Sequence, residues 1–343
     1  MNDLAAVGLA EATGAGARTR DLSELSSADA PQFGGKSASL GELLGAGIPV
    51  PGGFAVCAQA FLEHLQGAGI DAEAMAPGDA RRAIAAAPMA AATAEEVRRR
   101  YLALARAGGE PAVAVRSSAL GEDSEQATFA GQQESLLWVR GAGAVCDAVR
   151  ACWASLYSDE AVSYRAHLGA AAPRRPAMGV CVQLMVDAAA AGVMFTCNPV
   201  SGDPSVVAIN GSWGLGAAVV GGEVTPDDWL VSKVTGEVLR ATISPKHLEY
   251  VPSAEGSGTV CREVEPPRAQ APCLDEDALG RLVALARTVE RHFGCHQDIE
   301  WALDRAGELF VLQSRPVTAL PQRPRTDPPT SALALVMAKF GAA

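Results

Sequence analysis

The sequence predicts an α+β fold, and the order of its helical and extended segments is the reason. Apolar residues recur at helical spacing in residues 36–47, 58–109 and 144–167, with strand-like apolar runs between them. In the second half, short polar turns join neighbouring strand-like runs into hairpins. Helices and strands therefore alternate along a mixed chain, with hairpins concentrated towards the C-terminus, and an α/β arrangement is the alternative class.

The composition indicates a folded globular protein. Of the 343 residues, 49% are hydrophobic and 20% are charged, which is enough apolar material for a core. The net charge is −11, and no Lys/Arg stripe of the kind that binds nucleic acid is present. No run approaches the roughly 20 apolar residues of a membrane span, and the N-terminus lacks the features of a signal peptide. We therefore expect a cytoplasmic protein that binds neither nucleic acid nor membrane.

The individual elements follow from periodicity and turn residues. Gly45 and Gly47 end the first predicted helix, and Pro77 and Pro88 interrupt the second. The acidic residues Asp275, Glu276 and Asp277 suit a helix N-terminus, because that end of a helix carries a partial positive charge. The eight cysteines form no CxxC pair, which indicates free thiols. Strands are predicted at residues 112–119, 178–186 and 188–196, and residues 205–222 are predicted to form a strand that runs into a glycine-rich loop. The sequence also predicts a hairpin around Thr235-Gly236, a loop at 252–274 and a helix at 275–293.

The segment FGGKSASLGELL, residues 33–44, places Gly-Gly-Lys at the start of a predicted helix. It is not a P-loop, because Ala30 stands where that motif requires its first glycine. The N–H groups of a helix N-terminus nevertheless favour an anion, and Lys36 adds a positive charge. Lys36 is thus a candidate phosphate ligand, with a solvated surface lysine as the alternative.

Two further segments each leave two interpretations open. Arg116 lies near the end of an apolar strand, where a guanidinium either pairs with a carboxylate or contacts a ligand phosphate. The segment NGSWGLGAAVVGG fails the dinucleotide-binding fingerprint, because Val219 occupies the third glycine position. It is either a flexible loop or a place where the backbone approaches a ligand closely.

Residues 297–318 predict a hairpin that carries polar side chains where apolar ones are usual. Side chains alternate between the two faces of a strand, so Glu300 points away from the core-facing Trp301. Strict alternation on the return strand places Gln313 and Arg315 on one face together with Leu309 and Val311.

Pairing of these two strands brings Glu300 close to Gln313 and Arg315. Carboxylate and amide oxygens suit Mg²⁺, which is a hard cation, and a guanidinium binds phosphate with two hydrogen bonds. The hairpin therefore predicts a metal and phosphate site, with a salt-bridged structural hairpin as the alternative. The five histidines form no catalytic arrangement.

Taken in order, the motifs resemble a known family. They are GGKxxxLGEL, GIPVPGGFAV, VRSSA, TFAGQQES, GVMFTCNPVSGD, GLGxxVVGGEVTPD, and QDIEW with LQSRP. This set is similar to the nucleotide-binding domain of pyruvate phosphate dikinases and phosphoenolpyruvate synthases, which rifampicin phosphotransferases share. The resemblance implies the ATP-grasp fold, with ATP in the cleft between two subdomains. These would span residues 19–187 and 188–318, flanked by a flexible extension, 1–18, and a Pro-rich tail, 319–343.

The resemblance also implies the cofactors, ATP and Mg²⁺, and the site residues. These comprise the catalytic, phosphate-contacting Lys36, Arg116 and Arg315; the magnesium ligands Glu300 and Gln313; the segment edging the adenine, Gln183, Leu184, Met185 and Val186; and the mobile glycine loop from Thr128 to Gly131. The sequence departs from the family at Ala217, where a glutamate is common, and in the hairpin, which is one residue longer than expected.

The family passes phosphate through a histidine on a separate swivelling domain, and no matching histidine segment is present in this sequence. We therefore expect the ATP-binding subunit of a two-component dikinase-type phosphotransferase, active with a partner subunit that carries the histidine. Because the motifs end at LQSRPVT, the sequence resembles the small subunit of phenylphosphate synthase, which implies phenol or cresol as acceptor. The alternatives are a subunit of a split phosphoenolpyruvate synthase or of an antibiotic phosphotransferase, and a nucleotide-binding regulator with a decayed site.

Overall fold

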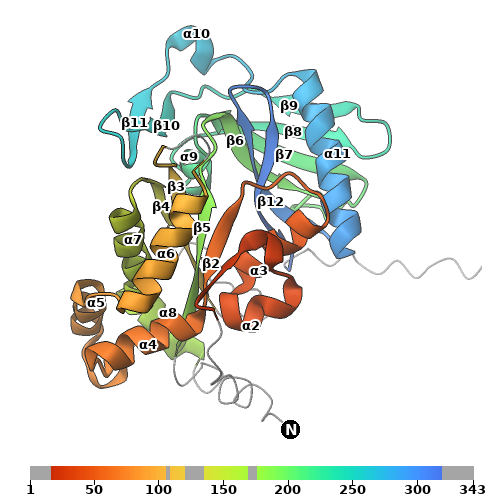
Figure 1. Cartoon of the computed structure of the whole chain (residues 1–343). Coiled ribbons are helices and arrows are strands. Elements are labelled where there is room, and N and C mark those ends of the chain that lie inside the picture. Colours follow the sequence, from red (N-terminus) through yellow and green to blue (C-terminus); the bar gives the residue numbers. More distant parts are fainter. Residues whose placement is uncertain (1–16, 106–108, 120–134, 169–175, 319–343) are drawn as a thin grey trace, which may run out of the picture.

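The structure, a computed structural model, describes residues 17–105, 109–119, 135–168 and 176–318 and contains two large antiparallel sheets (Figure 1). The first sheet has five strands in the order β1 (Thr19–Asp21), β2 (Gly53–Val56), β5 (Met178–Leu184), β3 (Val113–Ala119) and β4 (Ser135–Val139). The second has six in the order β13 (Leu309–Pro316), β12 (Gln297–Asp304), β6 (Ala188–Phe195), β7 (Val206–Trp213), β8 (Asp227–Ser232) and β9 (Val238–Thr242). The predicted mixture of helix and sheet is confirmed, and the antiparallel pairing makes the chain α+β.

The longer helices pack against these sheets. Helix α7 contacts β3, α4 contacts β5, and α11 contacts β12. The proline-interrupted segment forms three separate helices, as predicted. The helices are α2 (Ala30–Phe33), α3 (Gly35–Gly45), α4 (Ala58–Ala68), α5 (Pro77–Ala86), α6 (Ala91–Ala103), α7 (Ala142–Ser155), α8 (Asp159–Leu168), α9 (Ala217–Val220), α10 (Pro266–Ala269) and α11 (Glu276–Phe293), with short 3₁₀ turns at Leu22–Glu24, Ser27–Asp29 and Ala72–Ala74.

Helix α11 shows how the local sequence determines an element. The side chain of Asp275 accepts a hydrogen bond of 2.8 Å from the backbone N–H of Ala278, which caps the first turn. Gly294 ends the helix in the left-handed conformation, with φ of 71°. Between these ends, one apolar stripe is buried, consisting of Leu279, Leu282, Val283, Ala286 and Val289.

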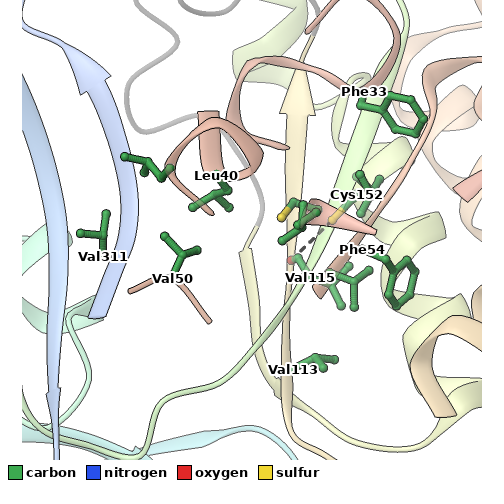
Figure 2. Packing of buried hydrophobic residues seen from close by; sticks show 14 of the residues in the cluster. Phe33, Leu40, Val50, Phe54, Val113, Val115, Cys152 and Val311 are labelled. Carbon is green, nitrogen blue, oxygen red and sulfur yellow. Dashed lines mark hydrogen bonds between the residues drawn. The ribbon is translucent and has the colours of Figure 1, made fainter. Parts of the chain in front are cut away.

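Helix α3 and the loop after it lie between the two sheets. The Ser39 hydroxyl donates to the carbonyl of Ser314 on β13 at 2.9 Å, and the N–H of Val311 donates to the carbonyl of Pro49 at 2.8 Å. Leu40 and Val50 lie between Val311 on β13 and the first sheet (Figure 2). A single cluster of buried residues therefore includes members from both sheets, which fixes α3 against β13.

Two predictions of local structure are wrong. Residues 144–167 form α7 and α8 rather than one helix, because the Ser158 hydroxyl accepts the N–H of Ala161 and starts a new helix. Residues 252–274, expected to be a loop, include the hairpin strand β11 (Thr259–Glu263), which pairs with β10 (Leu248–Pro252), and α10. The Ser- and Gly-rich residues of this segment form only the turn between the two strands.

Two expectations about the whole chain can also be compared with the structure. All eight cysteines are free, as predicted. Among the helices of the described ranges, none combines the length and the apolar character that crossing a membrane requires.

Candidate functional site

The site is built around a β-bulge in the β12–β13 hairpin. Glu300 lies opposite Gln313, whereas the next residue, Trp301, lies opposite Val311, so the pairing skips Leu312. The extra residue reverses the alternation of side chains along β13. Val311 therefore faces the core with Trp301, while Gln313 lies on the face of Glu300.

This bulge corrects the strict alternation expected from the sequence, which placed Val311 and Leu309 on the face of Gln313 and Arg315. It also accounts for the additional residue in the hairpin. The expected proximity of Glu300 and Gln313 is present, because the two residues are register partners.

One face of the first sheet carries a second group of polar residues. Arg116 on β3 is the register partner of Cys181 on β5, and Ala114 is the partner of Gln183. Residues two apart on a strand share a face, so Arg116, Cys181 and Gln183 all lie on the same side of the sheet. Gln183 is only 2% exposed, and no described residue accepts a hydrogen bond from its Nε2.

Lys36, in the first turn of α3, lies on this same face. Burial raises the pKa of the Cys181 thiol to about 11, and the positive charges of Arg116 and Lys36 act in the opposite direction, so both cations lie near the thiol. Gly34 allows the close approach of α3 to the sheet. A Cβ atom there would lie 2.1 Å from the carbonyl oxygen of Ser118, and its φ is 82°.

Arg116 connects the two groups. One of its terminal nitrogens lies 3.5 Å from the Glu300 carboxylate, and the other donates to the carbonyl of the bulge residue Leu312 at 3.3 Å. Its buried Nε has no hydrogen-bond partner among the described residues. The structure is therefore compatible with both interpretations of Arg116: it pairs with a carboxylate, and its unused N–H donor could bind a ligand phosphate.

Asp298 also lines the pocket, although it is not among the site residues predicted from the sequence. The guanidinium of Arg315 binds its Oδ2 through two nitrogens, at 2.8 and 2.9 Å. Burial raises the pKa of Asp298 even though Arg315 acts to lower it. The signal was its spacing of two from Glu300, which places both carboxylates on one face of β12.

These side chains line a pocket of about 250 Å³. Six of the lining residues lie on one face of the second sheet, the polar Asp298, Glu300, Gln313 and Arg315 on β12 and β13 beside their apolar neighbours Val193 and Phe195 on β6. Val219 and Val220 from α9 complete the lining. Ala217, the departure from the family pattern, is the first residue of α9. The glycine-rich segment that gave two interpretations thus supplies two of the residues that line the pocket.

An apolar cluster lies where the chain passes from one sheet to the other. We call it the boundary cluster; it contains Trp138, Val186, Ala188, Ala191, Leu215 and Ala302, with Ala112, Met185, Tyr250, Phe310 and Leu312 packed against it. Met185, Val186 and Asp187, here called the connector, join β5 of the first sheet to β6 of the second. Leu312 links this cluster to the pocket, because it precedes Gln313 in the bulge.

The structure thus brings together two strands of the first sheet, one helix and one hairpin around the predicted residues. Leu184 and Met185 are held by hydrogen bonds from their N–H groups to the carbonyls of Gly52 and Ala112, at 2.8 and 2.9 Å. Thr128 and Gly131 lie outside the described residues.

The residues present fit a magnesium ion that is shared with a phosphate ligand. No group of three His, Cys, Asp or Glu residues suited to a metal occurs within the described ranges. Mg²⁺ is usually held by one or two protein carboxylates together with phosphate oxygens and water. Glu300 and the Gln313 amide oxygen supply hard ligands of this type, and the contact with Arg116 shows that Glu300 already accommodates a positive charge.

Comparison with known proteins identifies the family. Residues 30–332 match the pyruvate phosphate dikinase AMP/ATP-binding domain. The chain belongs to this family. The resemblance predicted from the ordered motifs is therefore confirmed.

Similar proteins differ in the acceptors that their names suggest. A probable phosphoenolpyruvate synthase of Pyrococcus abyssi is 41% identical over 248 residues, covering 70% of this chain and 30% of its own length. A rifampicin phosphotransferase of a Streptomyces species is 44% identical over 225 residues, covering 66% of this chain and 25% of its own. The prodigiosin synthesizing transferase PigC of Serratia marcescens is 37% identical over 270 residues, covering 78% of this chain and 29% of its own length. The chain therefore spans less than a third of the length of these relatives.

Among solved structures, that of D-cycloserine synthetase DcsG aligns with 82% of the chain at 13% identity, with a TM-score of 0.26. This similarity is too low to carry an argument about the fold.

Proposed function

We propose that this chain binds Mg·ATP and is the ATP-binding component of a dikinase-type phosphotransferase. The observation that carries the proposal is the meeting of Arg116 from one sheet with Glu300 and Leu312 from the other, next to a pocket lined by Gln313 and Arg315. Membership of an AMP/ATP-binding domain family supports the identity of the ligand. ATP would lie between two ATP-grasp subdomains, residues 19–187 and 188–318, in the cytoplasm.

The phosphates would be held by cations that both sheets contribute. Lys36 and Arg116 approach from the first sheet and its covering helix, and Arg315 from β13. Asp298 orients Arg315 through two hydrogen bonds. Phosphoryl transfer is accelerated mainly by positioning and by neutralising charge, which is what these groups can supply.

Glu300 and Gln313 would hold Mg²⁺. A bound Mg²⁺ neutralises phosphate charge and fixes the orientation of the polyphosphate chain. Arg116 would leave Glu300 and contact the phosphates when Mg·ATP binds, since its Nε is unused in the present arrangement.

The adenine would bind along Gln183, Leu184 and the connector residues Met185 and Val186. An amide donor that is buried without a partner, as at Gln183 Nε2, is costly unless a ligand satisfies it, and purine rings offer acceptor nitrogens. Met185 and Val186 supply apolar contacts for the faces of the ring. The glycine loop from Thr128 to Gly131 is proposed to cover the terminal phosphates.

The phosphoryl acceptor would be a histidine outside these 343 residues. His64 is buried and contacts the carbonyl of Ile84, His292 contacts Glu42, and His296 contacts Glu290. His167 and His247, like these three, do not line the pocket. The β,γ-pyrophosphoryl group of ATP would pass to the external histidine while AMP leaves, and water would then release the γ-phosphate.

The partner subunit would pass the phosphoryl group from this histidine to a small acceptor. Phenol or cresol is the acceptor that the resemblance to phenylphosphate synthase favours. A second candidate is a split phosphoenolpyruvate synthase or antibiotic phosphotransferase, which the names of the similar proteins favour.

The test uses ATP labelled at either the β- or the γ-phosphate. Each form is incubated with the protein, Mg²⁺ and native cell extract, and acid-labile label is sought on a second polypeptide. We expect β-label on that polypeptide together with release of AMP. Transfer of γ-label alone would indicate an ordinary kinase, and binding of Mg·ATP without transfer would favour a nucleotide-binding regulator.

A pair of variants makes this test specific for the site. Lys36→Ala removes one proposed phosphate contact and should lower the rate of transfer by about 10²- to 10³-fold, as loss of one preorganised donor does. Arg240→Met removes an exposed cation that pairs with Asp228, away from the pocket, and should leave the rate unchanged. Equal rates in wild type and Lys36→Ala would contradict the role of Lys36.

A further inference from the structure

Trp138 on β4 has an unusual backbone conformation. Its φ is 58°, and within the described ranges it is the one residue other than glycine with a positive φ. A bulky side chain is disfavoured in this region, so the conformation persists only where the surrounding structure holds it. The pairing of β4 with β3 shifts at this point, which places Trp138 in a β-bulge.

The carbonyl of Trp138 is held by the turn between β10 and β11. The N–H of Gly258 donates to it at 2.9 Å and the Ser257 hydroxyl at 3.3 Å. The same hairpin is attached to the second sheet, because the N–H of Leu215 donates to the carbonyl of Tyr250 at 2.9 Å. Figure 1 shows the hairpin above β3 and β4. Trp138 thus belongs to the first sheet and is held by a separate two-stranded hairpin, which is bonded to the chain just after β7 of the second sheet.

The indole of Trp138 is buried in the boundary cluster and is only 7% exposed. This cluster contains Val186, and Met185 packs against it, so it includes two of the three connector residues. Arg116 and Glu300, the proposed phosphate and metal ligands, are not members of the cluster. The cluster reaches the connector through Met185 and Val186, and it reaches the phosphate end of the site only through Leu312 in the bulge, so the indole is placed to affect the connector more than the phosphate end.

We propose that Trp138 is a positioning residue that fixes the connector, and with it the end of the site that receives the purine base. The β10–β11 turn holds the strained backbone of Trp138, and the indole in turn holds Met185 and Val186. This inference rests on the proposed function, because it assigns the base to the connector. It extends that function by naming a residue that acts on base recognition through its neighbours.

The test compares the binding of Mg·ATP with that of Mg·tripolyphosphate, which lacks a base, by calorimetry on the full chain. Trp138→Asn removes the indole, and asparagine adopts the left-handed conformation more readily than most residues do. We expect the affinity for Mg·ATP to fall at least about tenfold, equivalent to 1.4 kcal/mol, with unchanged affinity for Mg·tripolyphosphate. Unchanged tripolyphosphate binding also shows that the variant is folded.

Two further variants sharpen the result. Trp138→Phe keeps an aromatic ring in the cluster and should recover most of the Mg·ATP affinity. Ser257→Ala removes one of the two hydrogen bonds to the Trp138 carbonyl and should weaken Mg·ATP binding by less than Trp138→Asn does, again without affecting tripolyphosphate.

The outcomes separate this inference from the function on which it rests. Wild-type Mg·ATP affinity in Trp138→Asn, or an equal loss of both ligands, would overturn the role of Trp138 and leave the proposed function standing. Failure of the wild-type chain to bind either ligand would overturn the proposed function and this inference with it.

Discussion

The molecule contains two charged pairs that differ in how completely they are satisfied. Lys246 and Asp227 are both fully buried, 2.7 Å apart. Lys246 also donates to the Ser244 carbonyl, and Asp227 accepts the N–H groups of Ser244 and Cys273. Arg116 and Glu300 are 3.5 Å apart and partly exposed, and Arg116 keeps a buried Nε without a partner in the described part of the chain.

This difference separates a structural pair from one that is available to a ligand. Buried charges are tolerated when they are paired and hydrogen-bonded, and the Lys246–Asp227 pair is both. A pair with a long contact and an unused donor can exchange its partner for another anion or cation without leaving a buried charge alone. We therefore propose that Lys246 and Asp227 contribute to stability, and that Arg116 and Glu300 contribute to ligand binding.

The largest expected effect is on stability, at the fully buried pair. Lys246→Met leaves the Asp227 carboxylate buried without its cation, so the free energy of unfolding should fall by about 3–5 kcal/mol. Denaturant unfolding followed by circular dichroism measures this change. The matched control is Arg240→Met, which breaks an exposed pair with Asp228 and should cost about 0–1 kcal/mol. Equal losses in the two variants would contradict the structural assignment.

The next effect is functional, at the partly exposed pair. Arg116→Met should lower phosphoryl transfer by about 10²- to 10³-fold, since it removes one of the proposed phosphate contacts. The same variant should bind Mn²⁺ more tightly than wild type when no nucleotide is present, because the guanidinium no longer competes for Glu300. Electron paramagnetic resonance of free Mn²⁺ reports this affinity. Weaker Mn²⁺ binding in Arg116→Met would show that the arginine does not occupy the metal position.

The smallest effect concerns pH and Asp298. Burial raises its pKa in the folded protein above the unfolded value, so the folded state binds more protons between these two pKa values. The stabilising contribution of Asp298 protonation to the free energy of unfolding is complete below the pKa of the unfolded state, near 3.8. It is lost as the pH rises through the pKa of the folded state. Relative to wild type, Asp298→Asn should therefore become more stable as the pH rises from about 4 to 7.

This prediction is measured as the difference in unfolding free energy between wild type and Asp298→Asn across that pH range. Asp147→Asn is the control, because Asp147 is 70% exposed and does not line the pocket. If the difference in unfolding free energy is constant with pH, or increasingly favours wild type towards pH 7, the ionised Asp298 carboxylate does not destabilise the folded protein.

Much of the fold was predictable because its signals are local. Asp275 and Gly294 determine the ends of α11, and the prolines divide the helical region into α4, α5 and α6. The β10–β11 hairpin was missed because charged pairs rather than an apolar alternation connect its exposed strand β11 to β10. Glu249, on β10, pairs with Arg262 and Arg268, which composition does not reveal.

The site was predictable in its residue types and less so in its geometry. Glu300 and Gln313 were expected to lie close together, and they are register partners. Alternation alone placed Gln313 on the face of Val311, because a bulge such as that at Leu312 depends on how two strands pair and not on either strand alone. Trp138 gave no signal in the sequence, since its strained backbone depends on the turn at Ser257 and Gly258.

The proposed metal and phosphate site is tested most directly by calorimetric titration of ATP into the purified chain, with and without Mg²⁺, for wild type and for Glu300→Ala. We expect Mg²⁺ to strengthen ATP binding to wild type at least about tenfold, and this dependence to be lost in Glu300→Ala, because the Glu300 carboxylate is the proposed metal ligand. Equal dependence on Mg²⁺ in both proteins, with both folded, would contradict a metal and phosphate site on the β12–β13 hairpin.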